Sequence, residues 1–323
     1  MPFLRSKIVG VGSYLPPKVV SNDDLSQLVE TSDAWIRERT GITQRHVAQQ
    51  ETTTEMGVKA AQKALKAAGL TASDVDALII ATSTPDLTLP STAALMAADL
   101  NIRGFAFDLS AACSGFVYGL TVADALLKAG SARRILLVGS EKLSKLTDWS
   151  DRNTCVLFGD GAGAFVLEAA EGTGTLKDRG ILDSILYADG KEYALLQTSG
   201  GVGSTGTAGF IQMNGREVFR HAVMKLEDVA SEILTRHLLT GNDIDWFVPH
   251  QANARIIDST AKRLSLAPEK IILTVDQHAN TSAASIPLAF DEAVQKGKIK
   301  SGDLILLDAM GAGFTWGAVL LRF

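Results

Sequence analysis

Residues 105–115, Phe-Ala-Phe-Asp-Leu-Ser-Ala-Ala-Cys-Ser-Gly, lead from an apolar run into a turn of small residues around Cys113. The run Phe105–Leu109 is nearly continuous in its apolar character, which is typical of a strand buried on both faces of a layered α/β protein. A similar turn around Ser282 follows 282 − 113 = 169 residues later and also precedes a helical pattern. The chain therefore repeats a strand-turn-helix unit.

A second pair of segments repeats with the same spacing. Asp-Val-Asp76 and Asp-Ile-Asp245 each precede an apolar run, and they lie 245 − 76 = 169 residues apart. Two periods are too few for a solenoid. We therefore predict an internally duplicated α/β protein with an N-terminal half of residues 1–172 and a C-terminal half of residues 173–323. The predicted boundary lies in the glycine-rich stretch Gly172–Gly180.

Apolar runs and helical periodicity predict the remaining elements. Strands are predicted at Val75–Ala81, Phe105–Leu109, Ile135–Gly139, Phe165–Glu168, Ile244–Val248, Ile271–Val275, Leu304–Leu307 and Trp316–Leu321. Helices are predicted at Thr53–Ala68, Ser91–Leu100, Ser114–Ala129, Glu217–His237, Asn253–Leu264 and Ser282–Gln295. The stretch Tyr193–Gly215 is rich in Gly, Ser and Thr, and it is predicted to be a loop.

The composition limits the class of protein. The 323 residues are 46% apolar and 21% charged, which excludes a disordered chain or a disulfide framework. The formal net charge is 31 − 36 = −5, so any basic docking surface must be a local patch. Two cysteines in a chain of this length indicate a reducing compartment. Because Pro and Gly interrupt Met1–Pro17 and the apolar run Leu109–Ala123 is shorter than the ~20 residues that span a bilayer, we expect a cytoplasmic protein.

Cys113 is the leading candidate for a nucleophile. Its small neighbours let a substrate approach, and the helix that follows offers free backbone N–H groups and a partial positive charge. Both features favour the thiolate, which is the reactive form of cysteine. The alternative is a small buried apolar residue, and the turn alone leaves both open. Cys155 lacks such a turn and is predicted to be structural.

Two polar residues lie in comparable positions. His250 follows the apolar run Asp245–Pro249, and open α/β sheets bind ligands at the carboxyl ends of their strands. The alternative for His250 is a capping or core histidine. Asn280 lies in the turn of the second half that matches Cys113, although asparagine is also common in turns and at helix N-caps.

Other motifs carry little weight. Gly201-Val-Gly203-Ser-Thr-Gly206 matches the dinucleotide fingerprint, but it lies in the polar stretch without a strand before it or a helix after it. The sequence contains no Walker loop, no His-Glu-x-x-His and no Cys-x-x-Cys, and its five histidines are scattered. We therefore predict neither a metal nor a nucleotide cofactor.

Motifs along almost the whole chain point to one family. They are Gly10–Pro16, Thr31–Ile36, Arg39–Ile42, Ala111–Phe116, Phe158–Gly163, Val248–Asn253, Asn280–Ser285 and Gly313–Gly317. At these spacings they resemble the β-ketoacyl-acyl-carrier-protein synthase III family of thiolase-fold condensing enzymes. Elongating ketoacyl synthases have a second histidine where this chain has Asn280, and thiolases have a second active-site cysteine. The resemblance implies an internally duplicated thiolase-like α/β fold with five layers, α-β-α-β-α, in a homodimer.

The resemblance implies an acyltransferase that starts fatty acid chains by decarboxylative condensation. Cys113 would take a short acyl group, such as acetyl, from acyl-coenzyme A, and the backbone N–H groups of Cys113 and Ala312 would hold the oxyanion. His250 and Asn280 would donate hydrogen bonds to the thioester oxygen of malonyl-acyl carrier protein as it loses carbon dioxide. No cofactor is implied besides these two substrates.

The resemblance also assigns binding roles. Trp35 and Arg152 would hold the adenine of coenzyme A between an indole and a guanidinium. The other binding residues that it implies are Arg39 and Asn253 in the pantetheine tunnel, Leu89 in the acyl pocket across a dimer interface, and Arg220, Arg255, Lys262 and Arg263 in a basic patch for the acidic carrier protein. For Lys262 and Arg263, charge on a solvated helix face is the alternative.

The residues leave other functions open. Ala312 stands in a run that is usually richer in glycine, and Leu89 replaces a bulkier aromatic residue of some members. One alternative is a coenzyme A-dependent relative that condenses or transfers acyl groups in secondary metabolism. Another is a non-catalytic acyl-binding subunit. The presence of Cys113, His250 and Asn280 together argues against that subunit, because a site without activity does not need all three.

Overall fold

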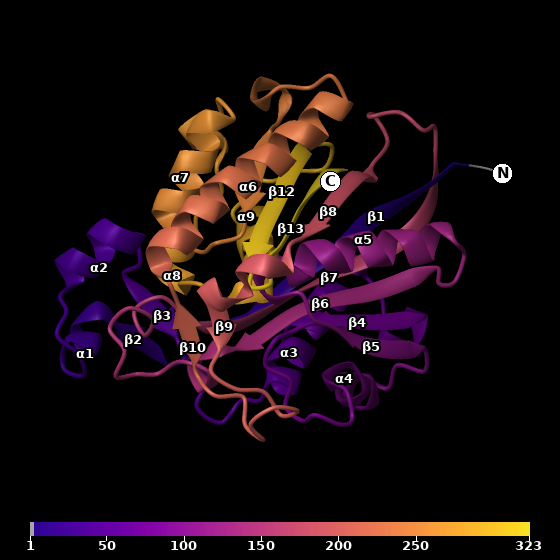
Figure 1. Cartoon of the computed structure of the whole chain (residues 1–323). Coiled ribbons are helices and arrows are strands. Elements are labelled where there is room, and N and C mark those ends of the chain that lie inside the picture. The colour runs from indigo at the N-terminus through magenta and orange to yellow at the C-terminus, as the bar shows by residue number, and fades with distance from the viewer. Residues whose placement is uncertain (1–2) are drawn as a thin grey trace.

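Two mixed sheets form the centre of this computed structural model, which describes residues 3–323 (Figure 1). The first sheet has the order β1-β7-β6-β4-β5, with bounds Phe3–Tyr14 (β1), Asp160–Gly172 (β7), Arg134–Lys142 (β6), Ala77–Ala81 (β4) and Phe105–Leu109 (β5). The second has the order β11-β12-β13-β8, with bounds Trp246–Pro249 (β11), Leu304–Gly311 (β12), Thr315–Arg322 (β13) and Gly180–Ala188 (β8). Two short pairs join β2 (Val19–Ser21) to β3 (Gln44–His46) and β9 (Leu196–Thr198) to β10 (Ile211–Met213).

The two sheets follow the same strand order. In the first, β4 lies parallel to β5 and β6, and β6 lies antiparallel to β7, which pairs with β1. In the second, β11 lies parallel to β12, and β12 lies antiparallel to β13, which pairs with β8. A single parallel bridge between Phe247 and Ile271 occupies the place of the β4–β5 pairing. The shared order supports the duplication, while the boundary at residue 172, where β7 ends, stays a prediction.

Helices complete the predicted five layers, α-β-α-β-α (Figure 1). The outer face of the first sheet is covered by α3 (Thr53–Ala68) and α4 (Thr92–Leu100), the space between the sheets holds α5 (Gly115–Lys128) and α9 (Ser285–Gln295), and the outer face of the second sheet is covered by α6 (Gly215–Arg236) and α7 (Ala254–Arg263). The shorter helices are α1 (Asn22–Ser26), α2 (Asp33–Thr40) and α8 (Val275–His278). None of the helices within residues 3–323 combines the length and apolar character that crossing a bilayer requires.

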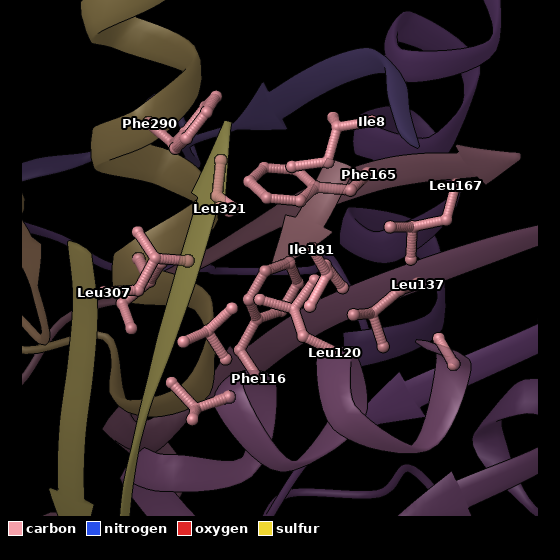
Figure 2. Packing of buried hydrophobic residues seen from close by; sticks show 14 of the residues in the cluster. Ile8, Phe116, Leu120, Leu137, Phe165, Leu167, Ile181, Phe290, Leu307 and Leu321 are labelled. Carbon is pink, nitrogen blue, oxygen red and sulfur yellow. The ribbon is translucent and has the colours of Figure 1, made fainter. Parts of the chain in front are cut away.

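The central helix layer contains the largest apolar core. The ring of Phe165 on β7 lies 4.9 Å from that of Phe116 on α5 and 4.9 Å from that of Phe290 on α9 (Figure 2). Along β12, Leu307 faces this core, whereas Leu306 faces α6. Apolar residues therefore follow one another without interruption, since both faces of the sheet are covered. The same packing brings the turns before α5 and α9 together.

Several predicted elements match at both ends. Helix α3 spans the predicted Thr53–Ala68, because a capping box at Thr52 begins it and Gly69, with φ 67°, ends it. Strand β5 spans the predicted Phe105–Leu109. The helix predicted from Ser91 begins one residue later, since the Ser91 hydroxyl accepts the N–H of Ala94 as an N-cap.

Two predictions about secondary structure are wrong. The segment Ile271–Val275 is not a strand beyond its bridge at Ile271. Instead, Gln251 Oε1 accepts the N–H groups of Thr274 (2.8 Å) and Val275 (3.1 Å), and α8 begins there. The stretch Tyr193–Gly215 is a loop only in its middle, because β9 and β10 pair near its ends.

Candidate active site

Cys113 lies in the turn between β5 and α5. The turn η2 (Ala112–Ser114) begins with Ala112 at φ 47°, a left-handed conformation that alanine adopts only at a cost. The Ser114 hydroxyl stabilises it by donating to Ala111 O (2.7 Å), and it also lies 2.8 Å from Thr315 Oγ1. Cys113 itself is partly exposed. The turn thus presents the thiol at the N-terminus of α5, as predicted.

The connection from β12 to β13 lies directly against this turn. A Cβ atom on Gly311 would lie 2.5 Å from the backbone nitrogen of Cys113, so only glycine allows this approach. Thr315 Oγ1 lies 3.0 Å from Ala111 O and 3.2 Å from Ala312 O. These contacts hold the segment with Ala312 beside Cys113, where the two predicted oxyanion donors belong.

His250 follows β11 directly and is buried. Its Nδ1 lies 2.7 Å from Ser285 Oγ, which also accepts the N–H of Gln251 (3.2 Å). Among the described residues, the Ser285 hydroxyl has no other acceptor, so it donates to Nδ1 and leaves the ring proton on Nε2. Burial lowers the pKa of His250 to about 3, and the ring is therefore neutral at neutral pH.

Asn280 is fixed by its own turn. Its backbone N–H donates to Leu157 O (2.9 Å), and its carbonyl accepts the N–H of Gly159 (3.0 Å). Its side-chain Oδ1 accepts the N–H of Ser282 (2.9 Å). With Oδ1 occupied, the amide Nδ2 remains a donor without a partner in residues 3–323.

The turn η7 (Ser282–Ala284) joins the three predicted catalytic residues. It carries the partner of Asn280, it is followed by the partner of His250, and it packs against η2. Ser282 has φ 50° and so corresponds to Ala112, which shifts the match between the halves to 282 − 112 = 170 residues here. The predicted equivalence of Cys113 and Ser282 is therefore wrong by one residue.

The thiol is less acidic than the sequence suggests. Burial raises the pKa of Cys113 to about 11, while the Ser282 side chain lowers this pKa and the charge of Glu141 raises it further. A helix N-terminus contributes at most ~2 kcal/mol, about 1.5 pKa units. Burial outweighs it, so the expectation that the turn holds a thiolate is wrong for this structure.

Models of the 3-oxoacyl-[acyl-carrier-protein] synthase III family match residues 107–190, and models of its C-terminal part match residues 234–323. The β-ketoacyl-[acyl-carrier-protein] synthase III of Chelativorans sp. (strain BNC1) is 55% identical to this chain and covers 99% of this chain and 100% of its own. The chain belongs to this synthase III family. Its members are condensing enzymes of the acyltransferase type.

Solved structures of synthase III agree with the fold. The 3-oxoacyl-[acyl-carrier-protein] synthase III of Aquifex aeolicus VF5 has a TM-score of 0.93 at 47% identity, covering 98% of this chain and 100% of its own. That of Pseudomonas aeruginosa PAO1 has a TM-score of 0.92 at 42% identity, covering 99% and 98%. The predicted thiolase-like fold is confirmed.

The structure gathers the residues predicted to hold coenzyme A in this synthase III. The guanidinium of Arg152 lies 4.3 Å from the centre of the Trp35 ring, and that of Arg39 lies 5.1 Å from it. Trp35 and Arg152 are in direct contact, so an adenine must separate them. Asn253 is the N-cap of α7, where its Oδ1 accepts the N–H of Arg255 (2.8 Å) and its Nδ2 donates to Arg39 O (3.0 Å). Both of its polar atoms are thus engaged.

Leu89 lies apart from the three turns. Its side chain is 84% exposed, so it lines no pocket of the single chain.

The predicted basic patch is exposed but mostly paired. Three of its members form ion pairs: Arg220 with Glu217, Lys262 with Asp258 and Arg263 with Glu227. The fourth, Arg255, lies over the ring of Phe219 at 5.5 Å.

Sequence reasoning missed the polar residues behind the site. Ser285 and Thr315 lie inside the quoted motifs, yet their roles depend on contacts across the fold. Glu141 on β6 is fully buried, and burial raises its pKa to about 7. The signal for Glu141 was a lone acid in an apolar strand, because acids are seldom fully buried without a partner.

Proposed function

We propose that this synthase III uses Cys113, His250 and Asn280 to condense acetyl-coenzyme A with malonyl-acyl carrier protein, the reaction that starts fatty acid chains. One observation carries the proposal. Two neutral side chains next to the Cys113 turn, His250 and Asn280, are each held by their neighbours so that a single N–H remains free to donate.

In the first step, the Cys113 sulfur attacks the thioester carbon of acetyl-coenzyme A and forms an acyl-enzyme. The negative charge that develops on the carbonyl oxygen needs donors that are already in place. The backbone N–H groups of Cys113 and Ala312 supply them, and the close approach of Gly311 to Cys113 supports this assignment.

In the second step, malonyl-acyl carrier protein loses carbon dioxide and becomes an enolate. The Nε2–H of His250 and the Nδ2–H of Asn280 donate to its thioester oxygen. Because burial lowers the pKa of His250 to about 3, this donor stays neutral at the pH of the cell and does not titrate. The enolate carbon then attacks the acyl group on Cys113 and releases a β-ketoacyl-acyl carrier protein.

Intact-mass spectrometry tests the first step. Wild type and Cys113→Ala are mixed with acetyl-coenzyme A and with longer or branched esters. We expect an acetyl adduct on the wild type alone. An adduct on both proteins, or on neither, would contradict the assignment of Cys113.

Decarboxylation of malonyl-acyl carrier protein tests the second step. His250→Ala and Asn280→Ala should each slow it by ~10²–10³ and leave the adduct largely intact. Normal decarboxylation in both variants would refute the donor roles. Decarboxylation of malonyl-coenzyme A at the same rate as the carrier-protein ester would favour the relative that acts in secondary metabolism.

We also propose a homodimer formed through β5. This strand is the edge of the first sheet, and Phe105 is 41% exposed and stacks on Phe107. Leu89 is exposed as well, so a second copy could bring it into the acyl pocket of its neighbour. Sedimentation should give twice the chain mass, and Phe105→Glu should lower it to the monomer. A monomeric wild type would contradict this proposal.

The remaining assignments follow the family position of each residue. Trp35, Arg39, Arg152 and Asn253 would bind coenzyme A, and Arg220, Arg255, Lys262 and Arg263 would bind the carrier protein. If the patch binds the carrier protein, affinity should fall steeply between 50 and 300 mM salt, values chosen around a Debye length of about 10 Å at 0.1 M. Both cysteines are free, which supports a reducing, cytoplasmic location.

A further inference from the structure

The proposed acylation step leaves one proton without an acceptor. The Cys113 thiol is protonated at neutral pH, since burial raises its pKa to about 11. His250 is a poor base, because burial lowers its pKa to about 3 and its Nδ1 already accepts from Ser285. Some other group must take the proton as the sulfur attacks.

Glu141 has one oxygen fixed and one open. Its Oε2 lies 2.8 Å from Thr84 Oγ1, 3.0 Å from Ser83 N and 3.3 Å from Thr82 Oγ1, all of which can donate to it. Its Oε1 is buried and has no partner within hydrogen-bond geometry among residues 3–323. An open, fully buried carboxylate oxygen costs free energy, so its presence calls for a function.

Ser282 connects this carboxyl to the thiol. The turn η7 packs between β6, which carries Glu141, and η2, which carries Cys113. The approach is close, since a Cβ atom on Gly139 of β6 would lie 2.5 Å from Ala283 O. The Ser282 side chain lowers the pKa of both Cys113 and Glu141. One hydroxyl has one proton, so Ser282 can stabilise only one of the two anions at a time.

We propose that Glu141, acting through the Ser282 hydroxyl, accepts the Cys113 proton during acylation and returns it when condensation frees the thiolate. This inference rests on the proposed function of Cys113. It adds an acceptor to the donors already assigned and gives the open Oε1 a partner.

The step balances over the whole cycle. The Cys113 thiol gives its proton to Ser282 Oγ while the Ser282 hydroxyl proton moves to Glu141 Oε1. The sulfur then bonds to the acyl carbon, the bond from that carbon to coenzyme A sulfur breaks, and the leaving thiolate takes a proton from water. When the enolate carbon attacks the acyl group, the bond to Cys113 breaks, and its thiolate recovers the proton from Glu141 through Ser282.

Other charged groups near Glu141 are engaged elsewhere. Lys142, the next residue on β6, donates to Glu51 O (2.5 Å), and Asp160, opposite Lys142 on β7, accepts from Ser144 and Ala48. Cys113 is the titratable group whose pKa the charge of Glu141 shifts. Glu141 and Cys113 therefore titrate as a pair.

The test compares Glu141→Gln, Ser282→Ala and the double variant in single-turnover acylation by acetyl-coenzyme A. General-base catalysis contributes ~10²–10⁴, so each single variant should acylate about 10²-fold more slowly. The double variant should lose no more than about threefold beyond either single one. The wild-type rate should rise with pH through an inflection near 7, where burial places the pKa of Glu141, and this inflection should vanish in Glu141→Gln.

Two controls separate proton transfer from a structural effect. Asp160→Asn also removes a buried carboxylate, and it should acylate within about threefold of the wild type. Decarboxylation of malonyl-acyl carrier protein should be unchanged in Ser282→Ala, which keeps the carboxyl in place. Unchanged acylation in both single variants, losses that multiply in the double one, or a retained inflection would overturn the proposal. A wild type that forms no adduct would instead overturn the proposed function.

Discussion

Replacing Gly311 by alanine would place a methyl group 2.5 Å from the backbone nitrogen of Cys113 and 3.1 Å from Ala112 Cβ. A real Cβ atom does not approach a backbone atom so closely, so one of the two chain segments must move. The movement separates the Cys113 N–H from the segment that carries Ala312. Loss of one oxyanion donor costs ~10²–10³ in rate, and overpacking costs about 1–3 kcal/mol in stability.

Single-turnover acylation by acetyl-coenzyme A measures this effect, and thermal unfolding measures the change in stability. Gly203→Ala is the matched control, because a Cβ atom there meets no atom within 4 Å. Thr315→Val provides a milder variant that removes the hydroxyl between Ala111 and Ala312 without a clash. A stable Gly311→Ala protein that acylates at the wild-type rate would refute the argument that these segments form the oxyanion site.

Three further predictions follow from the site. Because burial raises the pKa of Cys113 to about 11, alkylation by iodoacetamide should speed up about tenfold per pH unit between roughly pH 8 and 10, and a plateau below pH 8 would contradict the buried thiol. Ser285→Ala removes the donor to His250 Nδ1, so malonyl decarboxylation should slow about tenfold with little change in acylation, and equal losses in both steps would count against the tautomer. Arg152→Ala should weaken coenzyme A binding about tenfold with kcat nearly unchanged, as measured by calorimetry and kinetics, whereas unchanged affinity would remove Arg152 from the site.

The parts of the fold that the sequence predicted best are those whose burial pattern is local. Strand β5 and helix α3 show their periodicity and caps within a few residues. Strand β1 went unrecognised because Arg5 and two glycines interrupt its apolar residues. Arg5 is nevertheless buried, in an ion pair with Asp178 at 3.2 Å, and a Cβ atom on Gly12 would lie 2.4 Å from Ala64 N on α3. Both compensations come from distant chain segments.

The candidate site divides in the same way. Cys113, His250 and Asn280 each follow an apolar run or a matching turn, so sequence could propose them together. The partner of His250 could not be foreseen, because Ser285 reaches it across 35 residues of chain. Glu141 carried even less signal, since its neighbours Thr82 and Ser282 come from different halves of the fold.

The two matching turns differ in what they offer to the site. Ala112 and Ser282 share a left-handed backbone, with φ 47° and 50°, so each turn points its following residue at the other half. In the first half that residue is Cys113, and in the second it is Ala283, whose carbonyl packs against Gly139. The second turn therefore bears no nucleophile. Its polar groups instead serve the first turn: Asn280 is held as a donor, and Ser282 lies between the thiol and a buried carboxyl. Duplication thus supplies two similar turns, and the asymmetry in their side chains lets one provide the nucleophile and the other provide its hydrogen-bonding partners.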